Sequence, residues 1–586
     1  MISNRITNII AFLLLASAFT FCLFSILNDS WTFDETAHIG AGYSYLTEQD
    51  YRLNPEHPPL IKDLAAVPLL FLNLNFPEDH SSWIQEQEPV WWLQFNFARQ
   101  FLYESENDPD QILFFARMPM ILLFLFLAWF IFFWTRKLFG NKTALLSLFF
   151  VCLSPTFLAH GRLVTTDVGA ALGVVLSTYF WLKFLKKPSL KNVLLTALLL
   201  GISLLFKFSS LLLLPFLAII TLIYIYIHKL PLFKYVSLSI LIGLIALIFV
   251  IWPIYQAHTF NYPIQQQIKD TSYHLNSTSI PKSLLKPFLW MSGKPVLRSI
   301  NHYFTGVLMA FSRTAGGNTT FFMGEISAKA WKTYFPMVYL IKIPLSFHIL
   351  TLLALIWFLV FSHTKKKHKP KQKIKKWVSK YFTELSMLIF LIIYWAISIK
   401  GNLNIGIRHL LPIFPFTIIL VSYATIKWLK APFLKIKYIF LGFLVLWQIV
   451  SVVCIYPHFI AYFNQLIGGP ENGYKYVTDS NLDWGQDLKR LSQFVEQENI
   501  DKIYLNYFGG GSPEYYLGSK YQPWDAKQTP DKLPPDSWLA VSFNELQGGR
   551  AVSVKGFDQK TDYYKWLNKY KPVKTIGYSI SVYYIK

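Results

Sequence analysis

The residues of this chain that could do chemistry are ionisable side chains beside long apolar runs. The first is an acidic pair, Asp34 and Glu35, which follows an apolar run directly and stands beside Trp31 and Phe33. A carboxylate at a membrane surface is partly desolvated, and desolvation raises its proton affinity, so it becomes a better base. The alternative interpretation is that the pair caps the helix that follows.

A second candidate lies about twenty residues further on, in residues 54–62. The adjacent prolines Pro58 and Pro59 stiffen the chain, so Glu56 and His57 are held on a rigid bend. A cation follows at Lys62. The alternative is a turn between two interfacial helices whose polar side chains are simply in water.

A third group consists of ionisable residues at or near membrane depth. Each is costly there unless it is paired or faces a cavity. Several carboxylates and cations on one side of the membrane predict a cavity for a phosphate-bearing ligand, although any single one could be structurally paired. The members of this group are Arg117, Arg162, Asp167, Lys207, Lys342 and Arg408.

Long apolar segments must position these residues. Hydrophobic residues make up 53% of the 586 residues and charged residues only 15%, against about 25% charged in a soluble domain. Because the apolar runs are long enough to span a bilayer, we expect a polytopic α-helical membrane protein with about eleven transmembrane helices. The segments are 7–27, 111–134, 144–159, 168–182, 192–206, 209–227, 236–254, 336–362, 382–398, 409–426 and 438–456.

The charge distribution predicts how these helices are oriented. The net charge of +22 is concentrated in short basic loops, which are every second loop along the chain. One of them is a lysine-rich stretch at 365–380 that would contact anionic lipid. The positive-inside rule then places the N-terminus in the cytoplasm and the candidate residues outside a plasma (inner) membrane that the chain crosses many times. Scattered loops form no single basic face, so no nucleic-acid partner is expected.

The sequence also predicts that the chain has two domains. Residues 1–456 would form the transmembrane module, with large outside loops at 28–110 and 255–335. Residues 457–586 would form an extracytoplasmic α/β domain. Its expected elements are a helix at 484–497, strands at 502–508 and 538–543, and a strand pair at 575–585.

The order of these motifs resembles the GT-C-type polytopic membrane glycosyltransferases. Among them the chain is most similar to the dolichyl-phosphate-mannose–protein mannosyltransferase family and its bacterial relatives, including the lipid A aminoarabinose transferases. Those transferases carry Lys where this chain has His57, so the match favours the mannosyltransferase branch. The resemblance rests on Asp34-Glu35, His57-Pro58-Pro59-Leu60 with Lys62, Asp167, His302-x-x-x-Gly306, Lys342-Ile343-Pro344, Gly406-Ile407-Arg408-His409 and the tail segment 479–488.

This resemblance implies a hexosyl or pentosyl transferase that uses a polyprenyl-phosphate sugar as donor. Transfer to an extracytoplasmic acceptor hydroxyl would invert the anomeric carbon, with Asp34 as the base. The implied catalytic residues are Asp34, Glu35 and Asp167. The implied donor-phosphate ligands are Arg408, Lys62, Lys207 and Lys342, and the residues near the acceptor are Glu56, His57, Arg162 and His302.

Several alternatives stay open at this point. A divalent metal held by Asp34, Glu56 and His57 is possible but not favoured, and the acceptor could be a protein, a lipid or a glycan. A transporter or flippase for a lipid-linked or anionic substrate is the main alternative function. Transporters place ionisable residues near the bilayer midplane between repeated halves, whereas here these residues cluster near one face and no halves repeat. A receptor or scaffold would not need so many helices.

Overall fold

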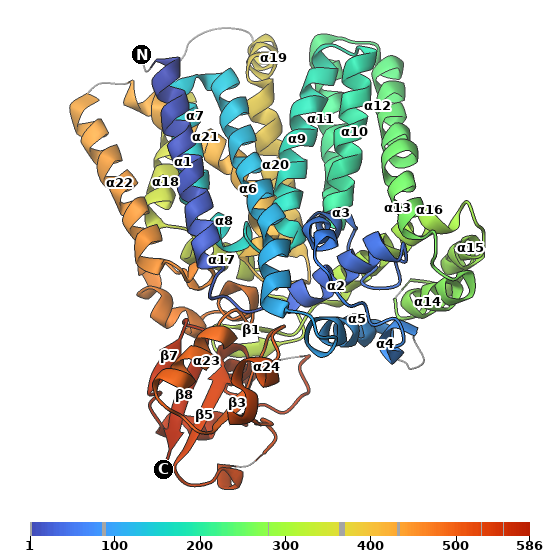
Figure 1. Ribbon diagram of the computed structural model, residues 1–586. Coiled ribbons are helices and arrows are strands. Elements are labelled where there is room, and N and C mark those ends of the chain that lie inside the picture. Colours follow the sequence, from blue (N-terminus) through green and yellow to red (C-terminus); the bar gives the residue numbers. More distant parts are fainter. Residues whose placement is uncertain are drawn as a thin grey trace.

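The computed structural model shows a bundle of long helices with a small mixed α/β unit at one end (Figure 1). The first helix, α1 (Asn4–Ser25), runs toward the end of the bundle where this unit lies. The structure describes residues 3–84, 90–278, 280–362, 370–430, 434–528, 530–554 and 556–586.

The bundle confirms a polytopic helical membrane protein. In these ranges eight helical stretches are long and apolar enough to cross a membrane, or nine if α17 and α18, which meet at 114°, count as one span. All eleven predicted segments fall on helices, but α7 (Asn141–Cys152) and α10 (Leu190–Phe206) are shorter than the roughly 20 residues of a full span. The remaining apolar elements are α6 (Pro109–Phe139), α9 (Thr166–Lys186), α11 (Leu213–His228), α12 (Leu232–Ala246), α17 (Tyr334–Lys342), α18 (Leu345–Ser362), α20 (Phe382–Lys400), α21 (Phe414–Leu429) and α22 (Leu434–Ile455).

Local sequence signals explain the ends of the longest helix, α6. The Asp108 side chain accepts hydrogen bonds from the amides of Asp110 and Gln111 at 3.0 and 3.1 Å, and Pro109 takes the first helical position, where no amide donor is needed. The helix ends at Gly140, whose φ of 85° suits glycine.

Basic residues gather at the end of the bundle that holds the N-terminus. The last turns of α6 and α9 carry Arg136 with Lys137 and Lys183 with Lys186. The lysine-bearing helix α19 (Pro370–Lys380) lies at the same end (Figure 1). Residues 365–369 of the predicted 365–380 stretch lie outside the described residues. The charge is thus separated along the bundle as the sequence predicts, whereas which end faces the cytoplasm stays a prediction.

The two large loops fold into short elements at the same end of the bundle as the tail (Figure 1). The first loop forms α2 (Phe33–Thr47), α3 (Leu60–Ala66), α4 (Ser81–Ile84) and α5 (Val90–Arg99). The second forms α14 (Ile264–Asn276), α15 (Lys282–Ser292), α16 (Arg298–Gly316), β1 (Thr320–Phe322) and β2 (Glu325–Ser327).

The tail confirms the predicted C-terminal α/β structure. Its five-stranded sheet has the order β4-β3-β5-β8-β7, in which β3 runs parallel to β4 and β5, and β8 runs antiparallel to β5 and β7. The short strand β4 was not expected. The predicted helix starts four residues late, since residues 484–487 contact the first loop instead. The elements are α23 (Leu488–Gln497), β3 (Ile503–Asn506), α24 (Pro513–Leu517), β4 (Tyr521–Pro523), β5 (Ser537–Ser542), α25 (Phe543–Gly548), β7 (Lys574–Ile576) and β8 (Ile580–Ile585).

The tail is joined to the rest of the chain by backbone pairing and buried charge. Strand β6 (Val552–Ser553) pairs in parallel with β2 of the second loop. The Asp29 carboxylate, just after α1, accepts from Arg162 and, at 2.6 Å, from Arg490 of α23. The Phe33 amide donates to the Trp484 carbonyl at 3.0 Å. Division into two domains at residue 456 stays a prediction, although α22 ends one residue earlier, at Ile455.

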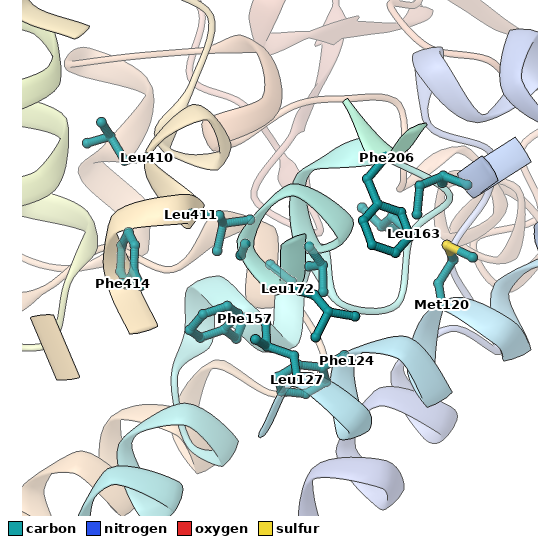
Figure 2. Close-up of a cluster of buried hydrophobic side chains, with 14 of the residues drawn as sticks. Met120, Phe124, Leu127, Phe157, Leu163, Leu172, Phe206, Leu410, Leu411 and Phe414 are labelled. Carbon is teal, nitrogen blue, oxygen red and sulfur yellow. The ribbon is translucent and has the colours of Figure 1, made fainter. Parts of the chain in front are cut away.

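An apolar core lies immediately beside the candidate residues. Figure 2 shows side chains from α6, α8 (Pro155–His160), α9 and α10 packed with others from the 3₁₀ turn η5 (Ile407–Ile413) and α21. These side chains are almost fully buried, so they fix the loop before Asp167 and the turn that carries Arg408. The labelled members are Met120, Phe124, Leu127, Phe157, Leu163, Leu172, Phe206, Leu410, Leu411 and Phe414.

Candidate active site

Four charged residues from distant parts of the sequence meet at the end of the bundle that faces the tail. Nη1 of Arg408 donates to Oδ2 of Asp34 at 2.9 Å and lies 3.5 Å from Oδ2 of Asp167. Nζ of Lys207 donates to Oδ1 of Asp167 at 2.5 Å. Two carboxylates and two cations therefore alternate in one chain of ion pairs. We call these four residues the charged cluster.

Helix ends position each member of the charged cluster. Asp34 lies in the first turn of α2, and Asp167 in the first turn of α9. Lys207 is the residue after α10, where the backbone becomes extended with φ −158°. Arg408 lies in η5, two residues after Gly406, where an added Cβ would approach Oγ of Ser480 to 2.3 Å. A glycine is therefore required for the close approach of η5 to the tail.

Two residues of the tail, Ser480 and Trp484, also contact the Arg408 side chain. Nε donates to Oγ of Ser480 at 3.1 Å, and Cζ lies 4.3 Å from the centre of the Trp484 ring. A guanidinium over an indole face is attracted to it, most strongly away from water. The sequence pointed to the segment 479–488 as a motif, but it did not single out either side chain as a site residue.

Glu35 lies beside the charged cluster in sequence but is fully engaged elsewhere. Its carboxylate is 0% exposed and accepts from Nε and Nη2 of Arg117 at 2.9 and 2.6 Å. It also accepts from the amides of Val164 and Thr32, both at 3.0 Å. Burial alone would raise the pKa of Glu35, but Arg117 and these amides outweigh burial and hold the pKa below its ordinary value. Glu35 thus ties α2 to α6 and to the loop before Asp167.

Two of the lysines that the sequence proposed as phosphate ligands have other partners. Nζ of Lys62 is buried, with the Tyr45 hydroxyl and the carbonyls of Asn54 and His57 within 2.9 Å, and burial lowers its pKa well below the ordinary value. Nζ of Lys342 donates to the carbonyls of Ile460 and Asn481, both at 2.6 Å. The structure does not bring either lysine into the charged cluster.

The four residues proposed near the acceptor are spread around the charged cluster. Arg162 binds Asp29, and Glu56 accepts from Arg313 at 3.0 Å. The His57 ring lies 5.3 Å from that of His38, and burial together with nearby positive charge lowers its pKa well below the ordinary value. The His302 ring is buried 4.6 Å from Tyr51. Among the described residues, none of these four makes a hydrogen bond or an ion pair with the charged cluster.

A large cavity lies next to the charged cluster, between the bundle and the tail. Its volume is about 1190 Å³, and Asp34 and Arg408 line it, whereas Asp167 and Lys207 lie behind them. Asp479 of the tail lines the same cavity, and burial raises the pKa of its carboxyl. Arg313, which the sequence did not mark, is a further cation on its wall.

The three side chains considered as possible metal ligands, Asp34, Glu56 and His57, are not grouped in the structure. Oδ2 of Asp34 binds Arg408, and Oε2 of Glu56 binds Arg313, so the two carboxylates serve different cations. Across the described ranges, no group of three or more His, Cys, Asp or Glu side chains is placed to hold an ion.

A comparison with protein families adds independent support for the resemblance that the motifs indicate. Residues 111–255 match the family model of dolichyl-phosphate-mannose-protein mannosyltransferases. The matched region contains Asp167 and Lys207 of the charged cluster, together with Arg117, the partner of Glu35. It ends well before Arg408 and the tail. No protein with a curated description matches the chain.

Three solved structures are similar to this chain over 47% to 98% of its length, with low sequence identity. ArnT from Cupriavidus metallidurans, bound to undecaprenyl phosphate, is 10% identical over 98% of this chain and 97% of that one, with a TM-score of 0.42. The Archaeoglobus fulgidus oligosaccharyltransferase is 10% identical over 88% of this chain and 64% of its own, with a TM-score of 0.44. The S. cerevisiae protein O-mannosyltransferase complex bound to the sugar donor is 15% identical over 47% and 34%, with a TM-score of 0.28.

Proposed function

We propose that this protein is a membrane glycosyltransferase that moves a sugar from a polyprenyl-phosphate carrier to an acceptor hydroxyl. The observation that carries this proposal is the charged cluster at the wall of the cavity. It supplies a carboxylate that can accept a proton and, bonded to it, a cation that can bind phosphate. The family match on residues 111–255 supports the same reaction class.

Asp34 and Arg408 act as a pair that the donor separates. In the absence of donor, the guanidinium satisfies the Asp34 carboxylate at 2.9 Å. The donor phosphate competes for the same guanidinium, whose planar fork can bind two phosphate oxygens. Once Arg408 binds phosphate, Asp34 loses its partner and becomes a stronger base.

The reaction then balances as a single displacement. The acceptor hydroxyl loses its proton to Asp34 while its oxygen bonds to the anomeric carbon. The bond between that carbon and the phosphate oxygen breaks, and the polyprenyl phosphate leaves with the electron pair from the opposite face. The configuration at the anomeric carbon therefore inverts. Arg408 stabilises the charge that develops on the leaving oxygen, which is worth most where water is excluded.

The remaining charged residues hold this pair in place. Asp167 is 1% exposed and binds both Lys207 and Arg408, so it orients the guanidinium from behind. Lys207 adds positive charge to the phosphate region without lining the cavity. Glu35 and Arg117 fix the start of α2, and with it Asp34. We therefore assign Glu35 and Asp167 positioning roles.

The basic residues at the far end of the bundle support an extracytoplasmic site. The positive-inside rule places the end with α19 in the cytoplasm, so the cavity and the tail would face outward. Such a site receives its sugar on a lipid carrier, and the sugar and the acceptor remain open at this level.

The test uses the full chain in lipid nanodiscs with a panel of radiolabelled polyprenyl-phosphate sugars and an envelope extract. We expect wild type to release polyprenyl phosphate and to label an acceptor, and Asp34→Asn to bind donor without transfer. The expected loss is about a thousandfold or more, because general-base catalysis and the released charge both disappear. Full activity of Asp34→Asn would show that Asp34 is not the base. Donor that crosses the bilayer unconsumed would indicate the flippase alternative.

A further inference from the structure

One wall of the cavity is formed by the tail, although the charged cluster that would carry out transfer lies on the opposite wall. Three strands of its sheet, β4, β3 and β5, are parallel neighbours. In open α/β sheets, ligands bind at the carboxyl ends of parallel strands. The cavity is lined by residues at these ends or within three residues of them: Asn506 of β3, Asp525 after β4, and Asn544 with Glu545 after β5.

The side chains at this edge offer both hydrogen-bond donors and acceptors. Asn506, Asn544 and Glu545 are half-buried. Nδ2 of Asn506 donates to the Tyr564 hydroxyl at 2.8 Å, and the backbone N–H of Asn544 donates to Asp483 at 2.8 Å, so the groups left for a ligand are the Asn506 carbonyl oxygen, the Asn544 side-chain amide and the Glu545 carboxylate. Side-chain amides donate and accept, and carboxylates accept, which matches hydroxyl groups that do both. The same wall carries the aromatic rings of Phe508, Tyr563 and Trp566.

The Trp566 ring is half-buried and lines this wall. Its indole nitrogen is itself buried and has no hydrogen-bond partner within the described residues. Indole and phenol side chains combine a flat apolar face with a polar group, so they suit a ligand that has both kinds of surface. A pyranose ring has one face of C–H bonds and a rim of hydroxyls.

The charge of the cavity wall argues against a strongly charged ligand. The wall carries the carboxylates Asp34, Asp479, Asp525, Glu545 and Asp562 and the cations Arg313, Arg408, Lys527 and Lys560, so it is close to neutral.

The cavity is also large enough for two substrates. Its volume of about 1190 Å³ exceeds the roughly 300–1,000 Å³ of a site for one small ligand. Asp34 and Arg408 lie on the wall of the bundle, and the carboxyl edge of the sheet lies on the wall of the tail. A sugar bound at this edge would present a hydroxyl toward the charged cluster.

We infer that the carboxyl edge of β3, β4 and β5, with Tyr563 and Trp566, is the acceptor subsite and that the acceptor is a neutral carbohydrate. This inference rests on the proposed function, since it assigns the second substrate of the same cavity. It gives the tail a role in selecting the acceptor.

The test is binding of the full-length protein, in nanodiscs, to an array of neutral and acidic glycans and to an array of Ser/Thr-containing peptides. We expect a neutral glycan to bind wild type and the affinity to fall about tenfold or more in Asn544→Ala and Trp566→Ala, because hydrogen-bonding and stacking groups are lost. Trp538→Ala is the matched control, since Trp538 lies on β5 of the same sheet but does not line the cavity. Thermal melting verifies that each variant is folded.

The results distinguish failure of the acceptor subsite from failure of the proposed transfer reaction. Binding of peptides instead of glycans, or of neither, would overturn the inference, as would glycan binding that Asn544→Ala and Trp566→Ala leave unchanged. Donor binding, measured on the same variants with polyprenyl-phosphate sugars, should be retained. If wild type binds glycan but no donor, the proposed transfer fails while the carbohydrate subsite stands.

Discussion

At the scale of single residues, Arg408 contacts both the membrane-spanning part and the tail. Asp34 and Asp167 contact it from the bundle side, and Ser480 and Trp484 contact it from the tail. Because four residues contact the guanidinium, it should keep its orientation when a phosphate replaces one of the two carboxylates. Preorganisation of this kind lowers the cost of charge stabilisation in the transition state.

Replacement of Trp484 by alanine should therefore slow transfer. Loss of a cation–π contact in a buried site costs about 2 kcal/mol, so we expect kcat to fall about tenfold to thirtyfold. The Michaelis constant for the acceptor should change little. Steady-state kinetics with donor and acceptor varied separately measures both.

Two companion variants make this prediction specific. Ser480→Ala removes one hydrogen bond to Nε and should have a smaller effect, whereas Arg408→Lys should lose most activity, since a lysine cannot make the same contacts. Unchanged kcat in Trp484→Ala, with the protein folded, would exclude a positioning role for the indole.

At the scale of elements, the Glu35–Arg117 pair joins α2 to α6. Both side chains are 0% exposed. Breaking a buried pair from one side leaves an uncompensated charge, which typically costs about 3–5 kcal/mol, whereas replacing both partners costs much less. We expect Arg117→Met to lower the melting temperature strongly, and Glu35→Gln with Arg117→Met to recover much of the loss. A double-mutant cycle of thermal denaturation in nanodiscs measures the coupling, and additive losses would contradict it.

The second loop should make stability depend on pH through Asp270 of α14. Burial raises the pKa of Asp270 to about 6, despite hydrogen bonds from Tyr262 and Gln266. A raised pKa means that the folded protein prefers the neutral carboxyl, so stability falls as pH rises from the unfolded value, about 4, to about 6. Asp270→Asn should then stabilise the protein by about 2 kcal/mol at pH 7 and hardly at all near pH 4.

Melting temperatures of wild type and Asp270→Asn between pH 4 and pH 8 measure this difference. Glu325→Gln on β2 serves as an exposed carboxylate control. An Asp270→Asn difference that is independent of pH would contradict the proposed titration.

The elements show how far the sequence could predict this molecule. Apolar length and the positive-inside rule predict the helices, because lipid leaves a chain few alternatives. The charged cluster was predictable for a similar reason, since charges at membrane depth need partners. Lys62 and Lys342 were assigned to phosphate because a sequence does not show that backbone carbonyls satisfy them. Ser480 and Trp484 were missed because nothing local marks their contact with Arg408.

At the scale of the whole molecule, Arg490 connects the tail to the bundle. It donates to Asp29, after α1, at 2.6 Å and to Asp487 at 2.5 Å. Arg490→Ala would leave Asp487 without its cation and Asp29 with Arg162 alone. We expect a lower melting temperature, faster proteolysis of the tail and reduced transfer together. Lys489→Ala, whose ion pair with Asp110 is more exposed, is the control and should change little. Loss of activity with unchanged proteolysis would contradict this account.

The contact of Arg408 with Ser480 and Trp484 also has a consequence in time. A ribosome makes every apolar segment of the bundle before it reaches residue 480. Until the tail has emerged and docked, the guanidinium lacks half of its surroundings. Membrane-inserted helices made before the tail could therefore bind the lipid carrier without transferring sugar. We expect transfer activity to begin only when the tail has folded onto the bundle.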